Sequence, residues 1–456
     1  MAANRLRGRH IVVLVFAVSR LVIVSSDQRE STLADVNVRY AIEAQRAASQ
    51  GMSFYKVHEE NRRLENPKSS AVERAVEYPP LTVLWMKAPA WFLDAAPQSG
   101  PAPEAYVKTA KRANQIAMFF VDLVGFGLLA LMGATMAQLA AYTAGGLLLF
   151  PVLYDRLDLL LGVLLLGAMA LLLKKWPIWA PLAVLAIAIN FKMTPLVLAP
   201  LFVLGTLPAD ALCVASGARP WGAIGKRLVI LLAIGAAVFL PFFVNDGTAT
   251  LDFLRYHAMR GLEIEAVWNT VPIAAAAIFQ WPAHPALRFG AFELNTAASG
   301  VLRTMASVYT AAVIPVLAYV LWKLLGMLGT AGKGRSGVTM AQANPPLFAR
   351  YAVVCLLTAM VGAHVLSPQY LLWLVPLVAL WEGQSQRCVW AVFLAICCLT
   401  TLSFPFLFNR AIHVMMAGKD LPLWSRLLWP APLIARNLVL VGLTVWLWIE
   451  TLRKPA

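Results

Sequence analysis

The sequence predicts an all-α, polytopic membrane helical bundle of about twelve spans, formed by a single integral membrane domain, residues 1–456, with long extracytoplasmic loops. Two observations predict this class. Of the 456 residues, 60% are hydrophobic and only 13% are charged, whereas soluble domains are about 45–50% apolar and about 25% charged. The apolar segments also have helical lengths, and they lack the period-2 alternation of a membrane β-barrel.

The net charge of +15 does not indicate a nucleic-acid-binding protein, because the Lys and Arg residues mostly lie in short loops between apolar segments. Membrane topology and contacts with membrane lipids explain them better. The sequence has 5 cysteines, and the first long polar loop has none of them. This pattern indicates neither a disulfide framework nor a zinc site.

The first apolar segment, residues 11–25, follows Arg5, Arg7 and Arg9. It could be a signal peptide, but Arg20 interrupts the apolar run and no Ala-x-Ala cleavage pattern follows, which favours a retained first span. Basic residues mark the cytoplasmic side of membrane proteins. We therefore expect a cytoplasmic N-terminus and a first extracytoplasmic loop at residues 26–79.

The same rule orders the remaining spans. A second span at 80–96 would lead to a cytoplasmic loop with Lys108, Lys111 and Arg112, and a third would cross at 114–134. If the basic pair Lys174-Lys175 is also cytoplasmic, the number of membrane crossings before it requires residues 135–156 to stay outside or to form a re-entrant hairpin. We expect a second extracytoplasmic region at 245–305, whose apolar part, 267–279, lies in the interface or re-enters the membrane. The C-terminus is expected to be cytoplasmic. The other expected spans are 157–173, 177–190, 192–207, 228–244, 306–326, 351–366, 370–381, 388–405 and 431–450.

Polar motifs gather on the predicted outer side. Asp35 begins a helix-like run, and Tyr40 follows five residues later. The Asp35 carboxylate could act as a base at the membrane surface, or it could cap the helix that follows it. The loop ends at Glu77-Tyr78-Pro79-Pro80-Leu81, where proline suits a first helical turn and Tyr78 suits the membrane interface.

The second outer region contains the motif Tyr256-His257-Ala258-Met259-Arg260-Gly261-Leu262-Glu263-Ile264-Glu265. On a helix His257 and Arg260 would share one face, and a guanidinium offers a planar fork for phosphate oxygens. Such a segment beside an apolar stretch fits recognition of an anionic lipid headgroup. The alternative is a solvated helix with a local ion pair between Arg260 and Glu263.

A further motif, His364-Val365-Leu366-Ser367-Pro368-Gln369-Tyr370-Leu371-Leu372-Trp373, lies at an expected junction of two spans. His364, Gln369 and Tyr370 bring hydrogen-bonding groups to membrane depth, where polar side chains are costly and usually functional. A structural kink at Pro368 is the alternative. Lys192, in Phe191-Lys192-Met193-Thr194-Pro195, lies at another outer hinge, as a snorkelling lysine or as a phosphate contact.

Taken in the order in which they occur along the chain, with Phe191–Pro195 before Tyr256–Glu265, the motifs resemble glycosyltransferase family 87, a family of C-type membrane glycosyltransferases that includes polyprenol-phosphate-mannose-dependent mannosyltransferases. The resemblance spans most of the chain. It is most specific at Arg260-Gly261 and at Ser367-Pro368-Gln369-Tyr370, and the remaining motifs, including Asp35…Tyr40…Gly51…Tyr55, keep the same order.

The resemblance implies a C-type glycosyltransferase fold in the plasma membrane, with an extracytoplasmic active site. The reaction would move a hexose, mannose first of all, from a polyprenyl-phosphate sugar donor to a lipid or glycan acceptor with inversion. Asp35 would be the catalytic base, with Asp27 as the alternative. The remaining substrate contacts would be Tyr40, Tyr78, Lys192, His257, Arg260, Glu265, His364, Gln369 and Tyr370.

The sequence requires no cofactor and shows no paired-acid metal motif, although Asp27 or Glu30 could supply a ligand for a divalent metal. A transporter or flippase of lipid-linked sugars is the alternative function. That class would place charged residues near the bilayer midplane, accessible from both sides, whereas the motifs here gather on one face.

Overall fold

The computed structural model describes residues 2–26, 35–65, 67, 69–88, 104–209, 211, 220–329, 337–408, 411, 414 and 427–453. It confirms an all-α membrane protein. Among the described residues, six helices are long and apolar enough to cross a membrane, and further shorter apolar helices accompany them. The described strands form one antiparallel hairpin, β1 (His284–Arg288) with β2 (Ala291–Asn295).

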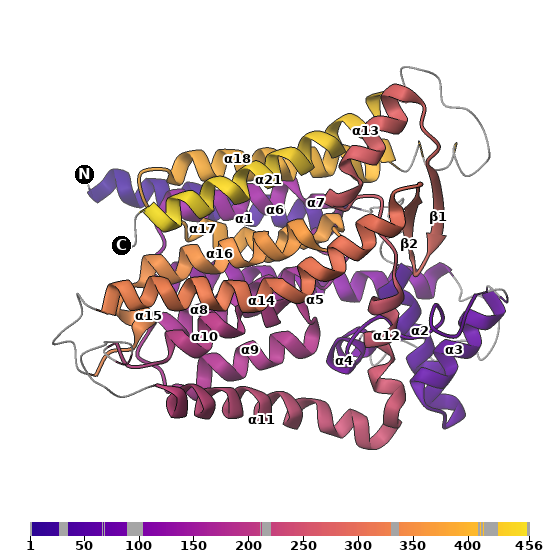
Figure 1. Ribbon diagram of the computed structural model, residues 1–456, viewed down its shortest axis with the longest axis horizontal. Coiled ribbons are helices and arrows are strands. Elements are labelled where there is room, and N and C mark those ends of the chain that lie inside the picture. Colours follow the sequence, from indigo (N-terminus) through magenta and orange to yellow (C-terminus); the bar gives the residue numbers. More distant parts are fainter. Residues whose placement is uncertain are drawn as a thin grey trace.

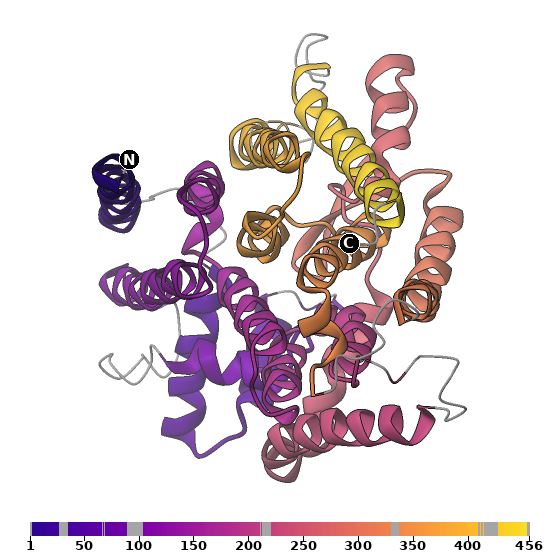
Figure 2. The same ribbon diagram turned by 90° about the vertical axis from the view of Figure 1, so that its left-hand side faces the viewer.

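Long helices run along the long axis of the molecule (Figure 1), and Figure 2 shows them end-on. The first and last helices place both chain termini at the same end, which we call the termini end. The β-hairpin lies at the opposite end, the hairpin end. The bundle helices are α1 (Ala2–Ser25), α5 (Glu104–Leu131), α6 (Met136–Leu148), α8 (Asp158–Leu173), α9 (Trp179–Phe191), α10 (Ala199–Gly205), α11 (Trp221–Asp246), α14 (Ser299–Gly329), α16 (Pro345–Gly362), α17 (Leu371–Ala379), α18 (Gln386–Thr401) and α21 (Pro430–Arg453).

Helix α8 lies in the core of the bundle and packs against α5, α9 and α17. It is apolar on all sides, which is typical of a helix that is buried all round. Gly162 allows α17 to approach closely, because a Cβ at this position would lie 2.5 Å from the Leu372 carbonyl oxygen. The first residue of α8 is Asp158, so this packing brings a carboxylate into the protein interior at the hairpin end.

Shorter elements gather at the hairpin end (Figure 1). They are α2 (Asp35–Gln50), α3 (Phe54–Glu65), α4 (Pro80–Lys87), α12 (Asp252–Met259), α13 (Thr270–Phe279) and the β-hairpin. Helices α2, α3 and α4 come from the first predicted loop and its end, and the others come from the second. The two polar regions therefore lie at one end of the bundle, as expected from the sequence.

The expected second span at 80–96 is wrong. Helix α4 begins beside α2 and is described as far as Lys87, and residues 89–103 lie outside the described residues. Helix α5 then begins beside the first loop, since Tyr106 donates a hydrogen bond to Gln45 of α2 and Arg112 donates one to the Val24 carbonyl. The basic residues at 108–112 therefore lie on the same side as the first loop, within α5 rather than in a cytoplasmic loop.

The expectation that residues 135–156 stay outside or form a re-entrant hairpin is also wrong. The 28 residues of α5 rise by about 40 Å, which carries the chain from the hairpin end to the termini end. Helix α6 then packs against α1, α17 and α18 and returns to the hairpin end. The two errors cancel, so the later spans keep their expected directions. Lys174 lies at the termini end, where its carbonyl oxygen is 2.6 Å from Gln342 Nε2.

A labelling experiment tests this revised path. In a variant without the native cysteines, we expect a membrane-impermeant maleimide to label Lys108→Cys from the same side as Lys56→Cys on α3. The control Lys175→Cys should be labelled only from the opposite side. Labelling of Lys108→Cys together with Lys175→Cys would contradict the fold and restore a span at 80–96.

Candidate functional site

Charged and aromatic side chains from five parts of the chain meet at the hairpin end. They come from the segment before α4, the turn before α8, the end of α9, α12 with the residues after it, and η7 (Pro368–Tyr370) with the start of α17. We call this group the central cluster. Its members are Glu77, Tyr78, Arg156, Asp158, Lys192, Tyr256, His257, Arg260, Tyr370 and Trp373.

Two neighbouring residues of α12 contact Glu77. The Tyr256 hydroxyl donates to Glu77 Oε2 over 3.2 Å, and His257 Nε2 lies 2.9 Å from the Glu77 carbonyl oxygen. A carbonyl only accepts, so Nε2 of this imidazole carries the proton. Burial alone would raise the pKa of Glu77, but the charges of Arg260 and Arg156 outweigh burial and hold it below its usual value. The carboxylate is therefore ionised at neutral pH.

Two guanidinium groups in the cluster keep unused donors. Arg260 Nη2 lies 3.6 Å from Glu263 Oε1, and among the described residues neither Arg260 Nε nor Arg156 Nε has a hydrogen-bond partner. Burial would lower the pKa of Arg260, but its acidic and phenolic neighbours, Glu263 first and Glu77 among the others, raise it. Both cations can therefore offer N–H donors to an anionic ligand without leaving a partner.

The residues after α12 are fixed by the hairpin and by the Ser367 motif. Gly261 N–H donates to Glu293 Oε1 on β2 over 2.7 Å, and a Cβ on Gly261 would lie 2.4 Å from that carboxylate. Glu263 accepts hydrogen bonds from the Leu366 N–H and the Ser367 hydroxyl, both over 2.8 Å. The two motifs that are most specific for the family resemblance are thus joined directly to each other.

Lys192 and an aromatic pair form the other wall of the cluster. The lysine Nζ lies 2.8 Å from Asp158 Oδ1, and it stands over the rings of Tyr370 and Trp373 at 4.3 and 4.8 Å. Trp373 Nε1 donates to the same Asp158 oxygen over 2.7 Å, and the two rings are stacked with centroids 4.2 Å apart. The salt bridge thus anchors the stacked pair, in which Trp373 is fully buried and Tyr370 is half-buried.

Sequence reasoning missed Asp158. Asp158 was placed at the start of an apolar span, residues 157–173, and Arg156 was given no role. The available signal was an acidic residue at the outer end of an otherwise apolar segment, directly after an arginine, because polar residues at membrane depth usually have a function. A cavity of about 20 Å³ lies between Arg156, Asp158 and Lys192, room for about one water, so a ligand must widen it.

Helix α2 reaches the cluster through Tyr40, which is buried and packs edge-on against Tyr78 with centroids 6.1 Å apart. Asp35 is the first residue of α2, and its side chain is not among those described. Asp27 and Glu30 lie outside the described residues.

Two predicted site residues, His364 and Glu265, face other helices. His364 Nε2 faces α14, 3.0 Å from Ser307 Oγ. Gln369 is buried beside Tyr370, and its Oε1 has no hydrogen-bond partner among the described residues. Glu265 faces α21, where its Oε1 is 3.7 Å from Arg436 Nη1. Burial raises the pKa of Glu265 to about 8, against the opposing charge of Arg436. Glu265 therefore joins the residues after α12 to the bundle.

No group of three His, Cys, Asp or Glu residues that could hold a metal ion is present in the described part of the chain. That part excludes Asp27 and Glu30. The prediction that either residue supplies a metal ligand stays untested.

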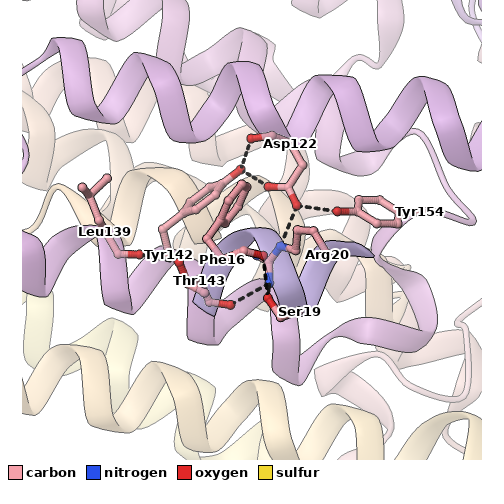
Figure 3. Close-up of polar contacts among 8 residues, drawn as sticks. All are labelled: Phe16, Ser19, Arg20, Asp122, Leu139, Tyr142, Thr143 and Tyr154. Atoms are coloured by element: carbon pink, nitrogen blue, oxygen red, sulfur yellow. Dashed lines mark hydrogen bonds and ion pairs between the residues drawn. The ribbon is translucent and has the colours of Figure 1, made fainter. Parts of the chain in front are cut away.

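A buried polar network lies in the bundle next to the turn that carries Arg156 and Asp158. Figure 3 shows Asp122 of α5 accepting from Arg20 Nε over 2.8 Å, from Tyr142 over 2.6 Å and from Tyr154 over 2.8 Å. Arg20 also donates to the Thr143 carbonyl of α6. The network therefore ties α1, α5 and α6 to the turn at residues 154–157, and through it fixes where Arg156 and Asp158 stand.

Comparisons with known proteins assign no family to the chain. No protein-family model matches it, and no curated protein matches it. Among solved structures it is similar to ArnT from Cupriavidus metallidurans, in the apo state and bound to undecaprenyl phosphate, each with 14% identity and a TM-score of 0.32. The alignments cover 98% and 95% of this chain and 78% and 77% of ArnT. A likeness at that score assigns neither an activity nor a substrate to this chain.

The buried network yields a stability prediction. Asp122→Asn should lower the free energy of unfolding by about 3–5 kcal/mol, because it leaves the Arg20 charge buried without a counter-charge. The double variant Arg20→Met/Asp122→Leu should recover much of that loss. The measurement is reversible unfolding in mixed micelles. As the matched control, Arg62→Met breaks the exposed pair with Glu65 and should cost less than about 1 kcal/mol; an equal loss in both would contradict the role of the network.

Proposed function

We propose that this protein is a membrane glycosyltransferase that moves a sugar, mannose in the first instance, from a polyprenyl phosphate to a hydroxyl of a lipid or glycan acceptor. The central cluster is the observation that carries this proposal. It combines two arginines with unused N–H donors and a stacked aromatic pair at one end of an apolar bundle. A lipid-linked sugar phosphate presents an anion, a sugar ring and an apolar tail to such a surface.

The donor phosphate would bind to the arginines. As the bond between the anomeric carbon and the phosphate oxygen breaks, negative charge grows on the phosphate, and Arg156 and Arg260 would stabilise that charge. Tyr370, the half-buried ring of the stacked pair, would contact the sugar. Lys192 would add its positive charge from beside Asp158, with Tyr78 and His257 completing the wall near Glu77.

The catalytic base must be a carboxylate that is not already neutralised by a cation or by hydrogen-bond donors. Asp158 is held by Lys192 and Trp373, and Glu263 by Leu366 and Ser367. The pKa of Glu77 is lowered by arginine charges despite its burial, which makes it a weak base. We assign the base to Asp35 at the start of α2, the helix whose Tyr40 reaches Tyr78.

The proposed step is a single displacement. The acceptor oxygen attacks the anomeric carbon while Asp35 takes the hydroxyl proton, and the polyprenyl phosphate leaves with the bonding electron pair. One displacement inverts the anomeric centre, so a β-linked donor gives an α-linked product. The cluster needs no cofactor for this chemistry.

The orientation of the site is part of the proposal. The termini end carries basic side chains such as Lys174, Lys175 and Lys226, and basic residues favour the cytoplasmic side. The hairpin end would therefore face outward from the plasma membrane, with both termini in the cytoplasm. A lipid-linked donor and a membrane acceptor can both reach a site there.

Transport of lipid-linked sugars is the second candidate, because Arg20 and Asp122 place charges inside the bundle, where transporters carry them. Both side chains are fully buried and bound to each other. A pair that is closed to solvent gives no access from either side of the membrane. The geometry therefore favours transfer at the hairpin end.

Asp35→Asn tests the function and the base together. Loss of general base catalysis should lower the transfer rate about 100-fold or more, with the unfolding transition unchanged. The measurement is transfer of radiolabelled mannose from polyprenyl-phosphate-mannose to membrane lipids by the purified protein in liposomes. The control Glu60→Gln removes an exposed carboxylate of α3 and should keep full activity. Full activity of Asp35→Asn would exclude Asp35 as the base, and no transfer by the wild type would refute the enzyme.

A further inference from the structure

A cavity of about 260 Å³ lies at the hairpin end, next to the central cluster but outside it. Its walls come from α3, from residues 71–76, and from η5 (Gly247–Leu251) with the start of α12. The volume approaches the lower limit of about 300 Å³ for small-molecule pockets. Six polar side chains line it, Ser53, Tyr55, Lys56, Glu59, Asp252 and Arg255.

The lining charges cancel, because Lys56 and Arg255 are matched by Glu59 and Asp252. Such a mixture of donors and acceptors suits a neutral ligand rich in hydroxyl groups. An anion would gain from the two cations but would be repelled by the two carboxylates. The cavity thus differs from the central cluster, where two arginines keep free N–H donors.

Tyr55 gives the cavity an unfilled hydrogen-bonding position. Its hydroxyl is buried and has no hydrogen-bond partner among the described residues. Burial, with Asp246 and Asp252 nearby, raises the pKa of Tyr55 well above its usual value, so the hydroxyl stays a protonated donor. Buried polar groups normally have partners, and a ligand hydroxyl in the cavity would supply one. The sequence motif contains Tyr55 without giving it a role.

We propose that this cavity binds a neutral, polyhydroxylated group, a sugar or polyol, and that this group belongs to the acceptor; the assignment to the acceptor rests on the proposed glycosyltransferase function. Two chain segments connect the cavity with the central cluster. Val76 and Arg255 line the cavity, and the next residues, Glu77 and Tyr256, belong to the cluster. A sugar held here would be a neighbour of the sugar whose hydroxyl reacts.

The test measures binding directly, without transfer. Saturation-transfer NMR titrates methyl α-D-mannopyranoside, a neutral hexoside, against the full-length protein in detergent micelles, with inorganic phosphate as competitor. We expect saturable binding that phosphate does not displace. Ala71→Phe and Ala249→Phe fill the cavity from two different walls, and each should abolish binding.

Tyr55→Phe separates a ligand contact from a structural tyrosine. Because the hydroxyl has no hydrogen-bond partner among the described residues, its removal should leave thermal stability unchanged, while hexoside binding weakens about three- to tenfold. Wild-type affinity in Tyr55→Phe would overturn the role of Tyr55, since the hydroxyl would then bond only to water. Absence of saturable binding, displacement by phosphate, or unchanged binding in both cavity-filling variants would overturn the site.

Transfer from polyprenyl-phosphate-mannose, measured on the same preparations, distinguishes the two proposals. A protein that binds the hexoside in this cavity but transfers no sugar keeps the sugar site and refutes the enzyme. A protein that transfers sugar but shows no hexoside binding refutes the cavity and keeps the enzyme.

Discussion

In a bundle of apolar helices, a charge that is taken out of water without a partner costs several kcal/mol, and this constraint shapes the structure around its buried charges. Asp158, buried at the start of α8, forms an ion pair with Lys192 and accepts a hydrogen bond from the Trp373 N–H. Arg20, buried in α1, likewise forms an ion pair with Asp122 of α5. Asp158 joins the start of α8 to the end of α9 and to Trp373 of α17, and the pair of Arg20 with Asp122 joins α1 to α5.

The same constraint explains the form of the site. Glu263 is paired with groups on both sides, and it joins the residues after α12 to those before η7. Arg156 and Arg260 retain donors that no described residue uses. In a site of this kind the paired carboxylates hold the chain segments together, and the Nε–H groups of the two arginines are left for an anion once the small cavity beside Arg156 widens. The neutral cavity behind it offers a second, differently charged surface for the acceptor.

The sequence predicted the fold class and the meeting of the polar motifs, because each motif lies at the end of an apolar segment and span parity places those ends together. It did not predict their contacts. The pairing of Arg20 with Asp122 joins residues 102 positions apart, and such a pair can be recognised only when the helices are placed. The topology prediction was wrong at Lys108 and its neighbours. Basic residues usually mark a cytoplasmic loop, whereas here they lie in the first turns of α5, beside α2.

If the hairpin end binds the phosphate of a polyprenyl lipid, the protein must distinguish a polyprenyl phosphate from the corresponding polyprenol. Native mass spectrometry of the full-length protein with equal amounts of the two lipids measures this preference directly. We expect the wild type to retain the phosphate-bearing lipid preferentially. Arg156→Gln, which removes a guanidinium whose Nε has no partner among the described residues, should lose the preference while still binding apolar chains. Equal retention of the alcohol and the phosphate by the wild type would exclude phosphate recognition at this end.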